Sequence, residues 1–298
     1  MGRRTQPNVG RSIEGSIGSS CHGVNEKCHG WTHGIDVPER PHVMKTPKVF
    51  AIYWDEYFDA NRQAVYTMNQ FFGQILTGSY MTQLYQYGGV EKGQFIGSTI
   101  IVPDPTNPPP AKPNILKWPF IEHQLREWIN QRKVPVKPDP HETNLLYVIF
   151  TPSTTNIGDC VGGYHHSGRY DDPEDARKHE AGDDNLFWAA IQEWHYNGPP
   201  ATPREFADSC TWVVSHEMVE AFTNRDGHGF HTKDCEIGDI CECAQGSKDK
   251  KAPIIKAEVD GWWVGNYWDN ENRSCYPLHI VPVAEAPSAG GYEIPRRR

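Results

Sequence analysis

The clearest hydrophobic pattern in the chain lies between residues 202 and 227. Thr202 and Glu205 have the Thr-x-x-Glu spacing of a capping box, and Pro203 would take the first helical position. Residues 224–227 supply a stop signal. Apolar side chains recur in between with a period of about 3.6 residues, at Phe206, Cys210, Val213, Val214, Met218, Ala221 and Phe222. The pattern predicts an amphipathic helix from Thr202 to about residue 223.

Weaker patterns predict the other elements. Buried strands are expected at 48–54 and 144–151, with further strands at 95–102, 262–264 and 276–281. Helices are expected within 61–87, at 117–132 and at 184–194. Strands that alternate with helices indicate a single α/β or α+β domain with a mixed sheet. We expect an extended N-terminal arm at 1–45, the domain at 46–282 and a loose C-terminal tail at 283–298.

The predicted helix carries the run His216-Glu217-Met218-Val219-Glu220. In a zincin H-E-x-x-H helix, the residues at i and i+4 bind zinc and the glutamate at i+1 is the general base. Glu220 stands here where the second histidine would be. At about 100° per residue, His216 and Glu220 lie on one edge of the apolar face and Glu217 points further into it. The run predicts a zincin-like metal-binding helix; a His/Glu pair on a surface helix is the alternative.

An acidic segment follows the helix. Residues 234–243 contain four carboxylates and three cysteines. A zinc ion on His216 and Glu220 needs another protein ligand, and Glu236, ahead of Asp239, is the expected one. Two other readings stay open: the segment binds calcium through oxygen ligands, or it is a disulfide-tied turn with solvated acids.

The helix and the acidic segment together resemble a known family. Residues 215–224 (SHEMVEAFTN) and 236–241 (EIGDIC) are similar to the signature of the EXORDIUM-like and phosphate-induced extracellular proteins, which have bacterial and fungal relatives. Residues 49–54, 146–151, 160–167 and 266–275 resemble other segments of that family. The chain departs from it at Asn224, where Asp is usual, and at Asp269, where Ser is usual. The resemblance implies a secreted protein with a zincin-like helix.

The chain has eight cysteines, an even number that suits disulfides in an oxidising compartment. Cys21 and Cys28 are expected to form a local disulfide; a zinc knot with the nearby histidines is the alternative. The cysteines of the acidic segment are expected to pin it to the C-terminal region. The disulfide candidates are Cys21, Cys28, Cys160, Cys210, Cys235, Cys241, Cys243 and Cys275. We expect a secreted protein, although no signal peptide is visible at the N-terminus.

Composition excludes some classes of partner. The formal net charge of −9 argues against nucleic acid, and no apolar run approaches the roughly 20 residues of a membrane-spanning helix. A peptide, protein or glycan is the expected substrate or ligand.

The expected chemistry is metal-assisted hydrolysis of a peptide or related amide, with Glu217 as general base. His165, His166, His228 and His231 are candidates for an oxyanion donor, and the last two also for metal ligands. Two carboxylate ligands would neutralise much of the ion's charge and weaken it as a Lewis acid. The alternative is therefore a non-catalytic secreted binding or structural protein, stabilised by metal and disulfides. Its glycan or protein partner would bind exposed aromatic residues such as Trp262, Trp263, Tyr267 and Trp268.

Overall fold

The structure is a computed structural model that describes residues 35, 38–106, 108–110, 115–138, 143–157, 162–170, 185–192, 200, 202–232, 235–243, 255–277 and 280–282. At its centre is a five-stranded sheet with the strand order β2-β1-β3-β5-β4. All neighbouring strands are parallel except the edge strand β4, which runs antiparallel to β5. The strands are β1 (Lys48–Tyr53), β2 (Gln94–Ile100), β3 (Leu145–Phe150), β4 (Gly163–Gly168) and β5 (Leu186–Ile191).

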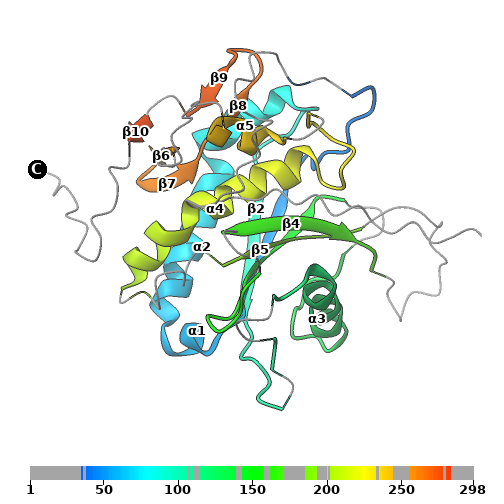
Figure 1. The fold of residues 1–298 in the computed structure, drawn as a ribbon, viewed down its shortest axis with the longest axis vertical. Coiled ribbons are helices and arrows are strands. Elements are labelled where there is room, and N and C mark those ends of the chain that lie inside the picture. The colour runs from blue at the N-terminus through cyan, green and yellow to red at the C-terminus, as the bar shows by residue number, and fades with distance from the viewer. Residues whose placement is uncertain are drawn as a thin grey trace, which may run out of the picture.

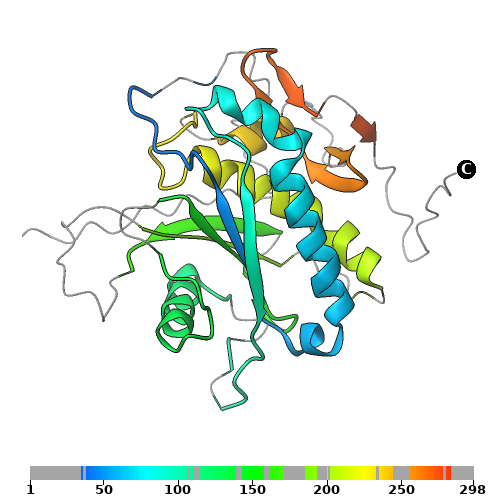
Figure 2. The same ribbon diagram turned by 180° about the vertical axis from the view of Figure 1, so that it is seen from behind.

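Helices cover both faces of this sheet (Figure 1). α2 (Arg62–Thr77) and α4 (Pro203–Thr223) lie on one face, and α3 (Trp118–Asn130) lies on the other. Side chains of β1 alternate between the two cores: Val49 and Ala51 face α2 and α4, whereas Phe50 faces α3. The short helix α1 (Glu56–Ala60) precedes α2, and the 3-10 helix η2 (Ser79–Gln86) follows it. Figure 2 shows α2 running beside β1 and β2.

The C-terminal region packs on the outer side of α4. A three-stranded antiparallel sheet of order β10-β6-β7 lies against the helix through β7, and the hairpin of β8 and β9 lies beside α5. The elements are α5 (Ile237–Cys243), β6 (Ile255–Val259), β7 (Trp262–Gly265), β8 (Tyr267–Asp269), β9 (Ser274–Tyr276) and β10 (Ile280–Pro282). The prediction of one α/β domain with a mixed sheet is confirmed.

Three predicted elements differ from the structure. The strand expected at 276–281 is replaced by the end of β9, at Tyr276, and the start of β10, at Ile280. Residues 184–194, expected to be a short helix, contain the strand β5. β5 is buried on both sides between β3 and β4, so its side chains form a continuous apolar run that has no strand periodicity. The acidic segment, for which no helix was predicted, contains the helix α5.

The aromatic residues proposed as a binding platform are mostly core residues. Trp262, Tyr267 and Trp268 are buried, and Trp262 stacks edge-on against Phe71 of α2. Trp263 is half-buried. These side chains stabilise the packing of the C-terminal strands and do not form an exposed surface for a glycan.

The cysteine predictions have mixed outcomes. Cys241 and Cys275 form a disulfide that joins α5 to β9, as expected for the acidic segment, and Cys235 is also disulfide-bonded. The expectation for Cys210 is wrong: it forms no disulfide, because α4 buries its thiol against Met68 of α2, 4.0 Å away. Cys21, Cys28, Cys160 and the side chain of Cys243 lie outside the described residues.

Most of the predicted arm, and the predicted tail at 283–298, lie outside the described residues. The described end of the arm packs on the domain, where Met44 is buried and its backbone N–H donates to Phe222 O at 2.8 Å. Among the described helices, none is long and apolar enough to cross a membrane.

Candidate metal centre

The helix α4 supplies the first group of candidate ligands. The predicted capping box is present: Glu205 N donates to Thr202 Oγ1 at 3.1 Å, and Thr202 N donates to Glu205 Oε2 at 2.9 Å. This cap fixes the start of a 21-residue helix whose second half is buried on all sides. His216, Glu217 and Glu220 are all fully buried there. The helix thus carries a histidine and two carboxylates into the core, which a surface helix would not do.

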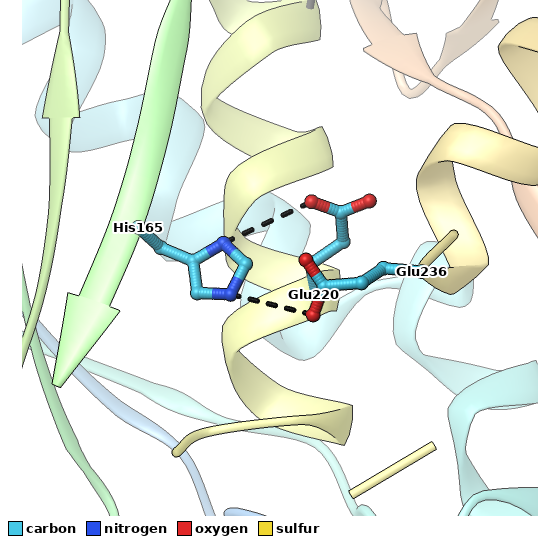
Figure 3. A group of neighbouring side chains, drawn as sticks. All are labelled: His165, Glu220 and Glu236. Carbon is cyan, nitrogen blue, oxygen red and sulfur yellow. Dashed lines mark ion pairs between the residues drawn. The ribbon is translucent and has the colours of Figure 1, made fainter. Parts of the chain in front are cut away.

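The edge strand β4 supplies His165. Successive side chains of a strand point to opposite faces, so His165 points toward α4 while His166 points toward α3. His165 Nδ1 lies 3.1 Å from Glu217 Oε2 and 3.8 Å from Glu220 Oε2, and its Nε2 lies 3.5 Å from Glu236 Oε1. Figure 3 shows each ring nitrogen of His165 facing a different carboxylate. Strand β4 therefore closes the site from the side opposite α5.

Glu236, which directly precedes α5, is held by the end of α4. Its Oε1 accepts a hydrogen bond from Asn224 Nδ2, while Asn224 Oδ1 accepts one from Gly229 N at 2.7 Å. Because Asn224 is fixed by Gly229, its amide presents a donor to Glu236. An ionised aspartate could not donate at this position. The amide of Asn224 therefore has a physical role in the site.

Asp239 lies in the first turn of α5 and connects the two sides of the cluster. Its backbone N–H donates to Glu220 Oε1 at 3.1 Å, and its Oδ2 accepts from Glu236 N at 3.2 Å. Its Oδ1 lies 3.8 Å from His216 Nε2, which itself lies 3.1 Å from Glu220 Oε1. The carboxylate of Asp239 is 15% exposed and is the ligand candidate nearest to solvent.

These side chains form two groups that share Glu220. Ligand atoms of His165, Glu220 and Glu236 lie within 4.8 Å of one another, and the same holds for His216, Glu220 and Asp239. Ligands about 2 Å from a tetrahedral zinc ion are roughly 3.3 Å apart. The closest ligand pairs in the site, at 3.1 to 3.8 Å, are near this spacing. These residues could hold a metal ion.

Two glycines allow the backbone to approach the site. A Cβ on Gly238 would lie 2.8 Å from His216 Nδ1 and 2.9 Å from Glu220 Oε1, and a Cβ on Gly265 would lie 3.1 Å from His216 Cβ. Any side chain at position 238 would displace at least one candidate ligand. The close packing of α5 and β7 around His216 thus requires glycine at positions 238 and 265.

Burial disturbs the protonation of the carboxylates. Burial raises the pKa of Glu220 well above its usual value, although nearby His216 opposes this. Burial also raises the pKa of Asp239, to about 6, again opposed by His216 and reinforced by the charge of Glu236. Without a bound cation, these two carboxylates retain protons more readily than exposed acids do.

For His165 and Glu236, the pKa shifts favour the charged forms. Burial alone would lower the pKa of His165, but the charges of Glu236 and Glu217 outweigh burial and hold it well above its usual value. Burial would raise the pKa of Glu236, but His165 and the amide of Asn224 outweigh it and lower this pKa. Without a metal, His165 is therefore the cation that balances Glu236.

Several polar atoms of the site fit a metal ion better than a closed hydrogen-bond network. Among the described residues, no hydrogen-bond partner reaches these buried atoms: His165 Nε2, Glu217 Oε1, Glu220 Oε2 and Glu236 Oε2. Buried polar atoms are nearly always satisfied, and a cation would satisfy those that face it. The donor set of imidazole nitrogens and carboxylate oxygens suits a divalent transition metal.

The site thus contains all five residues expected from the helix and the acidic segment: His216, Glu217, Glu220, Glu236 and Asp239. Of the four additional histidines, only His165 reaches it. His166 lies on the other face of the sheet, stacked on Trp118. His228 and His231 belong to neither ligand group and line a separate pocket with Arg40 and His42.

Comparisons with protein families, characterised proteins and solved structures gave no match. The resemblance to EXORDIUM-like proteins therefore stays a prediction from sequence motifs. Sequence reasoning also overlooked the roles of Asn224 and Gly238. The signal for Gly238 was its position between two acids of the segment, since glycine among functional residues often marks a close approach of the backbone.

Proposed function

We propose that this chain is a secreted metal-dependent hydrolase that cleaves a peptide or related amide bond. The observation that carries the proposal is the position of Glu217. Its Oε2 is 3.1 Å from His165 Nδ1, while its Oε1 is buried without a hydrogen-bond partner among the described residues. An oriented carboxylate with one available oxygen beside a cluster of metal ligands has the arrangement of a general base.

The metal would be held by one of two groups of residues: His165, Glu220 and Glu236, or His216, Glu220 and Asp239. When bound, a divalent ion lowers the pKa of a water molecule and polarises a carbonyl oxygen. The nitrogen ligands favour zinc or a similar transition metal over calcium, which prefers oxygen ligands throughout. If His165 held the ion through Nε2, its Nδ1 would keep the proton and could donate to Glu217, 3.1 Å away.

Glu217 accepts the proton of the attacking water at Oε1 and delivers it to the leaving nitrogen. The hydrogen bond from His165 to Oε2 keeps the carboxylate oriented for this transfer. The excess of carboxylate ligands reduces the positive charge available at the metal, which predicts a slow or narrowly specific hydrolase. Asp239, the most exposed ligand, marks the side from which water and substrate would reach the centre.

The test compares the wild type with the isosteric Glu217→Gln variant on a peptide library, with products read by mass spectrometry. Metal content is measured on the same samples. We expect the variant to lose about 100-fold or more in turnover, because general-base catalysis contributes about that much. It should keep the metal content of the wild type. Equal turnover in the two proteins, or cleavage that persists after chelation, would contradict the proposal.

A second candidate function is a non-catalytic secreted protein in which metal and disulfides stabilise a binding scaffold. The observation that favours it is burial, since His216 and Glu220 have no exposed surface. A structural ion needs no open position for water. In this case Glu217→Gln would leave partner binding unchanged, and only metal removal would weaken it.

A further inference from the structure

We propose that the centre binds two divalent cations bridged by Glu220, one with His165 and Glu236 and one with His216 and Asp239. This inference extends the proposed function, which requires only one ion. It rests on the different directions in which the two oxygens of Glu220 face. Oε1 lies 3.1 Å from His216 Nε2, whereas Oε2 lies 3.8 Å from His165 Nδ1.

Each half of the centre has the same composition. One histidine and one further carboxylate stand on either side of Glu220, and ligand atoms within each group lie within 4.8 Å. The halves come from different elements: β4 and the residue before α5 on one side, α4 and the first turn of α5 on the other. In two-metal hydrolases the ions lie roughly 3.5–4 Å apart, a separation that one carboxylate spans by giving one oxygen to each ion.

The total negative charge of the cluster also favours the binding of two cations. Glu217, Glu220, Glu236 and Asp239 bring four carboxylates into a region where only Asp239 has appreciable exposure. With neutral histidines, one divalent ion leaves two uncompensated negative charges in the core, and two ions leave none. Uncompensated buried charge is strongly destabilising, and metal binding displaces the protons that would otherwise neutralise it.

Different features of the structure support the two positions. On the His165 side, Oε2 of Glu220 and Oε2 of Glu236 are buried with no hydrogen-bond partner among the described residues. On the His216 side, Gly238 leaves room for the ligands, since a Cβ there would lie 2.9 Å from Glu220 Oε1. Asp239 is the only ligand with an exposed edge, so the ion on the His216 side should exchange more readily with solvent.

The experiment measures metal stoichiometry on the full chain. The protein is stripped with a chelator, titrated with Mn²⁺ alone, and examined by elemental analysis and electron paramagnetic resonance. We expect two equivalents and the spectrum of an exchange-coupled pair. Asp239→Asn should reduce the bound Mn²⁺ to one equivalent and replace the coupled spectrum with that of isolated Mn²⁺. Glu236→Gln should have the same effect, because it removes a ligand of the other ion.

Asp208→Asn is the matched control, because this residue is also an aspartate but lies near the start of α4, where it pairs with Arg204 at 2.8 Å. It should keep two equivalents and the coupled spectrum. One equivalent in the wild type, without coupling, would overturn the two-ion centre and leave the proposed hydrolase intact. No bound metal would overturn both. The wild-type titration decides the matter even if a variant fails to fold, which circular dichroism would reveal.

Discussion

His165 and His166 are neighbours in β4, but they meet opposite environments. His165 lies among carboxylates on the α4 face, with Glu217 at 3.1 Å and Glu236 at 3.5 Å. His166 lies on the α3 face between two tryptophans, with ring centroids 4.4 Å from Trp118 and 5.6 Å from Trp188. Around these two histidines, buried carboxylates line the α4 side of the sheet and aromatic rings line the α3 side. A histidine's role is set by the face on which the strand places it.

The largest expected difference between the two faces is their response to metal removal. A ligand at 1,000 times its Kd stabilises a protein by about 4 kcal/mol, so chelation should lower the free energy of unfolding by about that amount. Hydrogen exchange should locate the loss in α5 and the C-terminal half of α4, with α3 unchanged. Equal protection of α5 before and after chelation would contradict a metal on the α4 face.

Alanine substitutions of the two histidines should separate binding from packing. His165→Ala should abolish metal on its side of the centre, since it removes a ligand. His166→Ala should keep the full metal content but destabilise the fold by about 2–4 kcal/mol, because it leaves a cavity between two tryptophans. Elemental analysis and thermal unfolding of both variants check this. Loss of metal from His166→Ala alone would reverse the assignment of the faces.

The stability of Asn224→Asp should show how well the site on the α4 face tolerates one more negative charge. The substitution replaces the donor to Glu236 with another carboxylate and should cost about 2–3 kcal/mol in the chelated protein. Added zinc should recover part of this loss, because a cation attracts both acids. The control is Asn266→Asp, whose amide donates to Pro277 O at 3.0 Å. Its cost, measured by denaturant unfolding, should not depend on zinc.

Substitution of Asp269 should have a smaller effect on stability. Hydrogen bonds, and not a metal ion, stabilise the negative charge of this carboxylate. Burial would raise its pKa, but hydrogen bonds from Asn272, Gln86 and Glu271 N outweigh burial and lower it. Because the pKa is lower in the folded state, the ionised carboxylate stabilises the fold at pH values above the unfolded-state pKa of about 3.9. This stabilisation is lost as the pH falls through the folded-state pKa. At pH 7, the free energy of unfolding of the wild type should exceed that of Asp269→Asn by about 1 kcal/mol.

This difference should shrink toward zero as the pH falls from 5 to below 3, in urea unfolding curves measured at each pH. Chelation should not change it, since Asp269 belongs to neither ligand group. A difference that grows on acidification would show that the sign of the shift is wrong.

Local signals in the sequence predicted the parts of the site that are local in the chain. The capping box and the apolar period located α4 to within a residue, and the H-E-x-x-E run placed three of its side chains in the core. The strand β5 was missed because LFWAAI, at six residues, is an apolar run that fits a buried strand and a buried helix equally well.

The place of His165 could not be predicted, because it depends on strand order. β4 reaches α4 only because it is the antiparallel edge strand beside β5, and no local pattern sets that order. No strand was predicted at 163–168, so the sequence did not show that His165 and His166 point to opposite faces, or which of them faces α4. Similarly, the fourth carboxylate of the cluster, Asp239, reaches His216 only through the turn of α5.

Gly238 has a consequence for how this protein can vary. It offers no side chain to the chemistry, yet replacing it with even alanine would place an atom 2.8 Å from the ring of His216. A saturation library selected for activity should thus retain glycine at position 238 as strictly as histidine at position 216. Tolerance to substitution, read alone, would not distinguish a residue that reacts from one that only leaves space.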